Sequence, residues 1–418
     1  MKMTQKYLEI VDPIHDFIRI YEPELKVIDT PIFQRLRRIR QLAGAHLVYP
    51  SAQHSRFEHS LGVMHLAGQA AAVLTDKGFL DSDDAANLRL AGLLHDIGHG
   101  PFSHLFEEVL ERKKKTSHEE IGKKLILKTE IGDSFSKSGF DKKFLSELAF
   151  GNSKYPFMNE IISGGLSADI MDYLPRDGYF TGAEHAKIDF KRIIQSLDVH
   201  EKKLSLDRSA LYSFESMMIS RYQMFKAVYF HKTVRSAEVM LLESMSLADN
   251  ELGFTSYNLD KYIQLTDEFV ISKLVSLTPK SSELKRARQL AKDYQERRLL
   301  KCVFEKILTR NDKLAGVNTS KMLNEISKKS KVDESEIFID ASKTPSIPLT
   351  PSKKESQSII LTSKKGPVPK EAYELPISEI PLVSAISGFM DMLRVYTTEK
   401  NRKKVEIAAH VILGENKL

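Results

Sequence analysis

Three histidines and an aspartate occur within fourteen residues, AGLLHDIGHGPFSH at 91–104. Imidazole and carboxylate groups bind divalent ions such as Mn, Fe or Zn, and such sites keep open positions for water and phosphate oxygens. The adjacent His95 and Asp96 point about 100° apart on a helix, so they share one ion only where other segments supply the remaining ligands. Two segments offer such ligands: SRFEHS at 55–60 with His59, and SADIMDYLPRDG at 167–178 with Asp169, Asp172 and Asp177.

The histidines are concentrated in one part of the chain. A single helical histidine is more often a hydrogen-bonded core residue than a metal ligand, and the same holds for the His95–Asp96 pair by itself. Of the 13 histidines in 418 residues, eight lie between positions 46 and 118: His46, His54, His59, His65, His95, His99, His104 and His118. Burial of imidazole and carboxylate groups is costly without an organising charge, so this concentration favours a metal site.

Helical periodicity dominates the elements that must position these groups. Apolar and small residues at steps of three and four form a stripe over 61–73, and similar stripes recur at 85–97, 208–229, 233–248 and 258–276. The segment AANLRLAGLLHDIGHG predicts a buried helix that carries His95 and Asp96 on its last turn, before Gly98 and Gly100 let the chain turn away. Residues 5–21 alternate and contain proline, which predicts a short β-hairpin. The sequence therefore predicts a mainly α protein.

The C-terminal part is mixed. Residues 336–340 and 357–362 resemble strands on either side of a Pro/Ser/Lys-rich stretch at 341–356, and KKGPVPKE at 364–371 resembles a second flexible connection. The last segment combines a helical pattern with the strand-like RVYTT at 394–398. We therefore expect a mixed α/β C-terminal region that could form a small module or an oligomer contact.

Composition limits the class of protein. Cys302 is the only cysteine, which excludes an intrachain disulfide and a cysteine-based zinc site. No apolar run is long enough to span a membrane, and the N-terminus lacks the apolar stretch of a secretion signal, so the expected location is the cytoplasm. The net charge of +6, from 62 Lys+Arg against 56 Asp+Glu, is compatible with phosphate-bearing ligands, including nucleic acid. Tryptophan is absent and the aromatic residues are scattered, so no stacking platform for single strands is evident.

Several longer segments resemble a known family. The motif His59…His95-Asp96…Asp169 resembles the ligand pattern of the HD superfamily of metal-dependent phosphohydrolases. The segments IDTPIFQRLRRIRQLAGAHLVYPSAQHSRFEHSLGVMHLAG, AGLLHDIGHGPFSHLFE and DYLPRDGYFTG resemble the branch of deoxynucleoside triphosphate triphosphohydrolases, which includes dGTPase-like enzymes and the sterile-alpha-motif HD protein. The resemblance covers roughly residues 8–235. It implies an HD-domain helical bundle in which metal-bound water attacks the α-phosphorus of a deoxynucleoside triphosphate, releasing deoxynucleoside and triphosphate.

The resemblance also implies roles for individual residues. His59, His95, Asp96 and Asp169 would hold the metal, and Arg56 would contact the phosphate next to the sugar. His118 would be the general acid for the leaving oxygen, oriented by Glu107, while His99 and His104 line the substrate side. The remaining implied substrate contacts are Gln41, Tyr173 and Asp177 at the 3′-hydroxyl, Tyr229 against the 2′ position, and Arg221 at a phosphate. The metal would be Mn, Fe, Zn or Mg, and Mg could also accompany the substrate.

Two departures leave alternatives open. Where some relatives have a lysine that holds the terminal phosphate, this chain has Ile170. This substitution keeps a phosphatase or phosphodiesterase acting on another nucleotide as an alternative function. Asp29, Gln34 and Arg37 match residues that read an activating guanine nucleotide, which would make GTP or a dNTP an activator, but the partner positions near Leu8 and Val11 do not match. A nucleic-acid-binding protein with a residual HD site is the third hypothesis.

The resemblance suggests how the chain is divided and assembled. We expect an HD-domain metal-dependent phosphohydrolase core at 1–240, a helical extension at 241–340, a flexible linker-like region at 341–371 and a small C-terminal α/β segment at 372–418. We also expect a homo-oligomer, as a dimer or tetramer, and no membrane partner.

Overall fold

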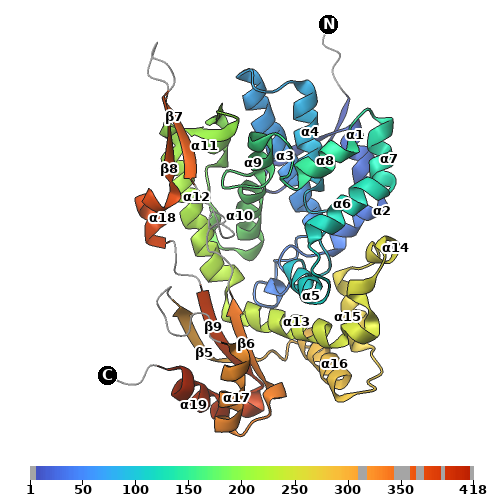
Figure 1. Ribbon diagram of the computed structural model, residues 1–418, viewed down its shortest axis with the longest axis vertical. Helices are drawn as coiled ribbons and strands as arrows, with labels where there is room; N and C mark the ends of the chain where they lie inside the picture. The colour runs from blue at the N-terminus through green and yellow to red at the C-terminus, as the bar shows by residue number, and fades with distance from the viewer. Residues whose placement is uncertain (1–5, 309–317, 343–357, 364–370, 387–390, 415–418) are drawn as a thin grey trace.

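The computed structural model describes residues 6–308, 318–342, 358–363, 371–386 and 391–414. Helices form most of this part of the chain, as the periodicity predicted (Figure 1). In the first half they are α1 (Glu22–Ile28), α2 (Pro31–Gln34), α3 (Arg56–Asp76), α4 (Ser82–Leu94), α5 (His104–Lys114), α6 (His118–Lys128), α7 (Glu130–Lys137), α8 (Lys142–Ala149), α9 (Pro156–Ile162), α10 (Ala168–Thr181) and α11 (Phe190–Gln195). In the second half they are α12 (Leu211–Met224), α13 (Lys232–Leu252), α14 (Leu259–Tyr262), α15 (Asp267–Val275), α16 (Ser282–Gln295), α17 (Thr319–Ser330), α18 (Pro381–Ile386) and α19 (Arg402–Leu413).

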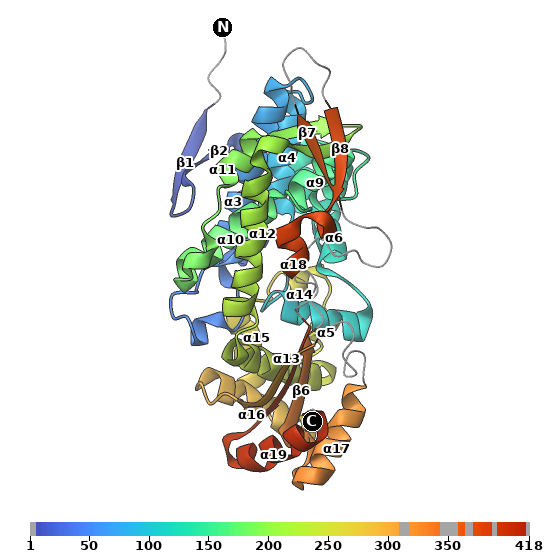
Figure 2. The same ribbon diagram turned by 90° about the vertical axis from the view of Figure 1, so that its left-hand side faces the viewer.

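The predicted N-terminal hairpin is confirmed. Strands β1 (Tyr7–Asp12) and β2 (Asp16–Tyr21) pair antiparallel in register from Tyr7 opposite Tyr21 to Asp12 opposite Asp16. The hairpin lies along one side of the helical body, as Figure 2 shows. Ile18 and Ile20 of β2 are buried in the main core, whereas Val11 and Phe17 face outward. The alternation of β2 therefore anchors the hairpin through one face.

Two further sheets contain strands from distant parts of the chain. The first has the order β3 (Leu197–His200), β4 (Lys203–Asp207), β7 (Ser358–Ser363) and β8 (Glu371–Pro376), with β4 and β7 parallel. The second has the order β5 (Lys301–Leu308), β9 (Asp391–Thr397) and β6 (Ile337–Ser342), all antiparallel. Strands β6, β7 and β9 were predicted from the sequence, whereas β3, β4, β5 and β8 were missed. Strands β3 and β4 come directly before the helical stripe at 208–229, and β8 follows the stretch predicted as a flexible connection.

The C-terminal residues contribute to both ends of the molecule. Strands β7 and β8 and helix α18 lie beside α11 and α12, whereas β5, β6, β9, α17 and α19 form a separate layer at the lower end (Figure 1). This lower module has its own apolar core, with Ile326 of α17, Val395 of β9 and Val405 of α19. Within the predicted connection at 341–371, 358–363 form β7, and 343–357 and 364–370 lie outside the described residues. The predicted four-part division of the chain remains a prediction.

Candidate metal centre and substrate site

Three helix ends bring the predicted metal ligands together. Helix α3 begins at Arg56 behind the N-cap Ser55, which places His59 in the first turn. Helix α4 ends at Leu94, so that His95 is its C-cap residue and Asp96 follows directly. Helix α10 begins behind the N-cap Ser167, which places Asp169 in its first turn. Helix α3 packs against both α4 and α10, and this packing makes the three ends meet.

The distances among the side-chain donors suit a single ion. The Nε2 atom of His59 lies 3.2 Å from Nε2 of His95, 3.6 Å from Oδ2 of Asp96 and 3.1 Å from Oδ1 of Asp169. Nε2 of His95 lies 3.4 Å from Asp96 Oδ1 and 3.8 Å from Asp169 Oδ1. Atoms that share an ion at about 2.1 Å are separated by roughly 3.0–3.4 Å in octahedral or tetrahedral geometry. Donor atoms of His59, His95 and Asp169 are all close enough to one another to hold one ion, and Asp96 offers a second carboxylate beside them. This set of imidazoles and carboxylates suits a divalent transition metal.

The electrostatics of this group favour a cation. Burial by itself lowers the pKa of His59, but hydrogen bonds with Asp169 and Asp172 outweigh burial and raise that pKa to about 10. An imidazole with such a strong preference for the protonated form lies in a field of negative charge. A bound divalent cation would supply the positive charge that these carboxylates favour.

Residues behind the ligands fix the orientation of His59 and His95. Nδ1 of His59 hydrogen-bonds Oδ2 of Asp172 at 2.7 Å, which leaves Nε2 to face the ligand group. Asp172 is fully buried and also accepts from both Nε and Nη2 of Arg176, each at 2.9 Å. Burial opposes ionisation of Asp172, yet Arg176 holds the pKa of Asp172 well below its ordinary value. Nδ1 of His95 lies 2.8 Å from the carbonyl oxygen of Gly92.

The hairpin completes this supporting network. Nε2 of His15 lies 2.6 Å from Oδ1 of Asp172, and Asp12 accepts from Arg176 at 2.8 Å. Asp172 was a candidate ligand from the sequence, whereas Arg176, His15 and Asp12 were missed. The four-residue spacing of Asp172 and Arg176 on one predicted helix was a usable signal. The hairpin residues gave none, because their contact spans more than 150 residues of sequence.

A glycine in α3 provides a test of this supporting network. A Cβ atom on Gly62 would lie 1.7 Å from Asp172 Oδ1 and 2.7 Å from Arg176 Nη2. Because Asp172 is fully buried, Gly62→Ala is expected to displace the carboxylate that orients His59 and to weaken metal affinity by roughly 10- to 100-fold, the usual effect of losing such a partner. Titration with Mn²⁺ followed by calorimetry measures this change.

Gly68 in the same helix serves as the matched control. A Cβ there meets Nη1 of the Arg89 side chain at 2.6 Å, and the end of a long side chain can move aside. Gly68→Ala should leave metal affinity unchanged, because the added methyl group meets only the Arg89 side chain and no residue of the metal group. The helix itself should tolerate the change, since alanine is a better helix former than glycine. Equal metal affinity in the two variants would contradict the role assigned to Asp172.

Arg56 lies between the metal group and a loop. Its guanidinium forms an ion pair with Asp96 through Nη1, and its Nε donates to Ser103 Oγ at 2.7 Å. Ser103 Oγ in turn donates to the carbonyl oxygen of Arg40 at 2.8 Å. Arg56 is 3% exposed. Burial opposes ionisation of Asp96, but the charge of Arg56 outweighs burial and holds the pKa of Asp96 well below its ordinary value. The predicted phosphate-binding arginine thus lies directly beside a predicted ligand.

The loop that carries Ser103 has an unusual backbone. Phe102 and Ser103 both have positive φ, 57° and 56°, a region that non-glycine residues rarely adopt. The buried carboxylate of Asp267 accepts from the backbone N–H of Phe102 at 2.7 Å and of Arg40 at 3.0 Å. Asp267 lies at the start of α15, within the helical stripe predicted over 258–276, but it was not among the predicted site residues. It therefore ties the strained loop to the rest of the protein.

Burial raises the pKa of Asp267 from 3.8 to about 6, which makes stability depend on pH in a defined direction. A carboxyl group with a higher pKa in the folded state stabilises the fold most when protonated, so its contribution falls as pH rises from about 4 to 6. Relative to Asp267→Asn, the wild-type free energy of unfolding should fall by about 3 kcal/mol between pH 4 and 7. Urea unfolding of both proteins in EDTA at several pH values measures this difference, and parallel pH profiles would contradict it.

A second cluster lies beside the metal group. Nε2 of His99 is 3.3 Å from Oδ1 of Asp96, and the His99 ring stacks on that of His118 with centroids 3.9 Å apart. Glu107 Oε1 lies 2.5 Å from Nδ1 of His118, and Oε2 lies 3.3 Å from Nδ1 of the exposed His104. Burial holds the pKa of His99 well below its ordinary value, so this imidazole is neutral. Burial opposes ionisation of Glu107, but hydrogen bonds with His104 and His118 lower its pKa.

The predicted sugar contacts also lie together. The hydroxyl of Tyr229 donates to Asp177 Oδ2 at 2.6 Å, and Nε2 of His54 lies 2.8 Å from Asp177 Oδ1. The rings of Tyr173 and Tyr229 meet edge to face with centroids 6.5 Å apart, and the Arg221 guanidinium lies 6.0 Å from the Tyr173 ring. Burial raises the pKa of both tyrosines, so both are neutral. His54 was missed as a partner of Asp177, although it belongs to the histidine-rich segment.

Gln41 lies beside this group. Its backbone N–H donates to the carbonyl oxygen of His54 at 3.1 Å. Its side-chain Oε1 is buried and has no hydrogen-bond partner among the residues that the structure describes. Such an acceptor suits a ligand hydroxyl.

The predicted activator residues form a separate group. Gln34 donates to the Ile28 carbonyl at 2.8 Å and accepts from Arg37 Nε at 2.8 Å, while Asp29 is exposed. Among the residues that the structure describes, no hydrogen bond or ion pair connects these three to the metal ligands. Ile170 is buried in the core, at 2% exposed.

Comparison with known families accounts for both halves of the chain. Residues 56–177 match the HD domain, and residues 188–417 match the HD associated region, which covers more than half of the chain. The chain belongs to the HD-domain phosphohydrolases. The matched HD domain begins at Arg56, ends at Asp177 and contains all four predicted metal ligands. The resemblance inferred from the sequence and the mainly helical HD fold are both confirmed.

Relatives and solved structures agree with this assignment. The chain is 31% identical over 346 residues to deoxynucleoside triphosphate triphosphohydrolase SAMHD1 of Homo sapiens, covering 71% of this chain and 55% of that protein. The SAMHD1 homolog of Dictyostelium discoideum is 32% identical, with 73% of this chain and 61% of that protein covered. An uncharacterized protein of Methanocaldococcus jannaschii is 41% identical, over 56% of this chain and 48% of that protein. The chain thus spans about half the length of these relatives.

Two solved structures match nearly the whole chain. A hypothetical protein from Aquifex aeolicus has a TM-score of 0.77 and 30% identity, covering 96% of this chain and 100% of its own. A phosphohydrolase from Bacteroides thetaiotaomicron has a TM-score of 0.76 and 26% identity, covering 94% of this chain and 100% of its own. Within the described residues, no helix is both long and apolar enough to span a membrane.

Proposed function

We propose that this HD-domain protein hydrolyses deoxynucleoside triphosphates to a deoxynucleoside and triphosphate. The observation that carries the proposal is one face of α10. Asp169, Tyr173 and Asp177 are four residues apart, so they follow one another along this face over about 12 Å of helix. The face runs from the metal ligands to the hydrogen bond between Asp177 and Tyr229. This order matches a ligand with a phosphoryl group at one end and a sugar hydroxyl group at the other.

The reaction requires few groups. When bound by His59, His95, Asp96 and Asp169, a divalent cation supplies a Lewis acid for phosphoryl oxygen and lowers the pKa of water. The oxygen of water bonds to the α-phosphorus and its proton is released to solvent, the bond from this phosphorus to the 5′-oxygen breaks, and the 5′-oxygen takes up a proton. His118 donates this proton, held by Glu107 through Nδ1 so that Nε2 can face the leaving group. The guanidinium of Arg56 binds a phosphate oxygen beside the metal group.

Substrate selection follows from the sugar side. Asp177 and the free acceptor of Gln41 suit a 3′-hydroxyl group, and the Tyr229 ring would crowd a 2′-hydroxyl group. Arg221, beside Tyr173, is available for a phosphate. The names of the SAMHD1 relatives support a deoxynucleoside triphosphate as substrate. The proposed metal is Mn, Fe, Zn or Mg. The proposal also includes assembly into a homo-oligomer. It further includes activation by GTP or a dNTP that binds at Asp29, Gln34 and Arg37.

The buried Ile170 favours a second candidate function. It offers no charge to a terminal phosphate, so the protein could instead act as a phosphatase or phosphodiesterase on another nucleotide. The two functions differ in the bond that breaks. Release of triphosphate requires cleavage at the α-phosphorus, whereas a phosphatase releases orthophosphate.

Product analysis tests both candidates. The metal-loaded protein is incubated with each dNTP, with and without GTP, and the products are separated by anion exchange. Triphosphate and deoxynucleoside, absent with Asp96→Ala, are the expected products. Orthophosphate as the product would favour the phosphatase. No turnover of any dNTP with Mn, Fe, Zn or Mg would overturn the proposed reaction.

A further inference from the structure

One strand of the lower module reaches the substrate site. Strand β9 is the central strand of its sheet, between β5 and β6. Its side chains alternate, because successive residues of a strand face opposite sides of the sheet. Leu393 and Val395 are buried within the module together with α17 and α19. Met392, Arg394 and Tyr396 lie on the opposite face, which turns towards the helical core.

All three residues of this face contact one short segment of the core. Met392 packs in a small apolar cluster with Phe225 and Phe230, against which Tyr229 also packs. Nη2 of the buried Arg394 donates to the carbonyl oxygen of Phe230 at 2.5 Å. The hydroxyl of Tyr396 donates to the carbonyl oxygen of Lys232 at 3.0 Å. The three contacts therefore follow the core chain over residues 225–232.

The contacted segment carries Tyr229 into the substrate site. Residues Phe225–Tyr229 form a π-helix between α12 and α13, a rare turn that is often found at functional sites. The backbone N–H of Phe230 donates to the Phe225 carbonyl at 2.7 Å, which closes the wide turn. Tyr229 is the last residue of this turn, and its hydroxyl donates to Asp177. Arg394 thus donates to the carbonyl oxygen of Phe230, the residue that directly follows Tyr229.

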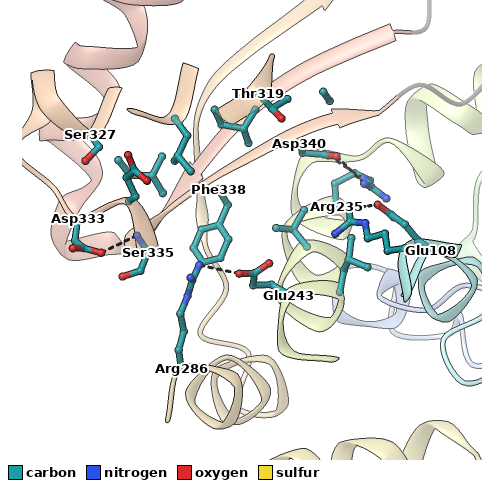
Figure 3. A pocket seen from close by; sticks show the side chains of 18 residues that line it. Glu108, Arg235, Glu243, Arg286, Thr319, Ser327, Asp333, Ser335, Phe338 and Asp340 are labelled. Atoms are coloured by element: carbon teal, nitrogen blue, oxygen red, sulfur yellow. Dashed lines mark hydrogen bonds and ion pairs between the residues drawn. The ribbon is translucent and has the colours of Figure 1, made fainter. Parts of the chain in front are cut away.

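A second anchor holds the module at the same place. Arg235 of α13 donates to both carboxylate oxygens of Asp340 in β6, at 2.8 and 3.0 Å (Figure 3). Further along α13, a cleft of about 910 Å³ separates this helix from β6 and α17, with Glu243, Arg286 and Phe338 among the residues that line it. The attachment of the module to α13 is therefore concentrated at the start of that helix, next to Tyr229.

We propose that Met392, Arg394 and Tyr396 of the HD-associated region position Tyr229 and thereby set how strictly the enzyme selects the sugar. This proposal rests on the proposed function, since it concerns the same substrate site. The three residues touch no substrate and act only through the backbone and apolar packing of residues 225–232. A shift of the π-helix would move the Tyr229 ring away from the 2′ position and leave the metal ligands in place.

The test compares the two faces of β9. Arg394→Met removes the hydrogen bond to Phe230 and also the ion pair with Glu305 of β5. Tyr396→Phe removes only the hydrogen bond to Lys232 and leaves the sheet contacts in place. Val395→Ala is the matched control, because Val395 is fully buried on the opposite face. Values of kcat and KM are measured for a dNTP and the corresponding ribonucleotide, together with the unfolding temperature. Arg394→Met should lower the preference for the dNTP roughly tenfold, the scale on which a small change in a binding pocket alters discrimination.

The control separates positioning from loss of stability. Val395→Ala should lower the unfolding temperature and keep the wild-type preference, whereas Tyr396→Phe should reduce the preference with little loss of stability. An unchanged preference in folded Arg394→Met, or in Tyr396→Phe if Arg394→Met does not fold, would overturn the proposal. An equal loss of preference in Val395→Ala would also overturn it.

Hydrogen exchange provides a readout that does not depend on activity. Amides of residues 225–232 should exchange faster in Arg394→Met than in Val395→Ala, while those of α10 exchange alike. If the wild-type protein hydrolysed no dNTP, the proposed function and the role in sugar selection would both fail. Faster exchange confined to 225–232 would still support the positioning of Tyr229, and unchanged exchange there would overturn it.

Discussion

Asp169→Asn is expected to abolish tight metal binding and to slow dNTP hydrolysis about a thousandfold, which corresponds to roughly 4 kcal/mol of lost transition-state stabilisation. Asparagine has nearly the same shape as aspartate but lacks the negative charge that a divalent cation requires. The Asp169 side chain is 35% exposed at the start of α10, so the fold does not depend on its burial. Metal content after gel filtration and initial rates of triphosphate release measure the two effects.

Stability measurements make this prediction independent of catalysis. A ligand that binds only the folded state raises the unfolding temperature, so Mn²⁺ should stabilise the wild-type protein and not Asp169→Asn. In EDTA Asp169→Asn loses its ion pair with His59, so the readout is the rise in unfolding temperature that Mn²⁺ causes in each protein relative to EDTA. Asp76→Asn, an exposed aspartate at the far end of α3, is the control and should keep full metal content and activity. Wild-type metal content in Asp169→Asn would contradict the assigned ligand set.

His118→Gln is expected to reduce turnover by about 10²- to 10⁴-fold and to leave metal content unchanged, because the lost group is the proton donor and not a ligand. In the wild-type protein Glu107 holds Nδ1 of His118, and the ring stacks on the neutral His99. Glutamine preserves a polar side chain of similar length but cannot donate a proton to the leaving 5′-oxygen. Steady-state kinetics with a dNTP measure the loss.

The leaving group distinguishes this role from simple damage to the site. A substrate analogue whose leaving group is p-nitrophenol needs little protonation, so His118→Gln should hydrolyse it at close to the wild-type rate. The exposed His185 is the control, and His185→Gln should behave like the wild-type protein with both substrates. Equal losses with the dNTP and the p-nitrophenyl analogue would argue against His118 as the general acid.

The candidate site was predictable where a pattern within one segment carried it. His59, His95, Asp96 and Asp169 each occur beside a recognisable helix start or end, and these ends determine where the side chains lie. The longer resembling segments supplied the family, because several of them occur in the same order. Histidine concentration supported the metal hypothesis, although His54 is placed against Asp177 and not against the ligands.

Other contributors depended on contacts between distant segments. Asp267 holds a strained loop more than 160 residues earlier in the chain, and His15 meets Asp172 across a comparable separation. The patterns of their segments predicted a helix for Asp267 and a hairpin for His15, but neither pattern indicated the distant contact. Strand β5 was also missed, because it pairs with β9, more than 80 residues later in the chain, beyond the range over which local propensity is informative. Strands β3 and β4, in contrast, pair with each other across a tight turn, so this hairpin was a local pattern that was overlooked.

The sequence by itself determined the mainly helical class, the N-terminal hairpin, the family and the residue types of the metal group. These properties follow from local periodicity, capping residues and contiguous motifs, which act over a few turns of chain. Only the tertiary structure decided that Asp172 supports His59, that Asp267 anchors the loop at Phe102, and that β9 contacts the turn before α13. The physical reason is that burial and hydrogen bonding are satisfied by whichever group is nearest in space, and packing brings that group from a part of the chain that no local pattern identifies.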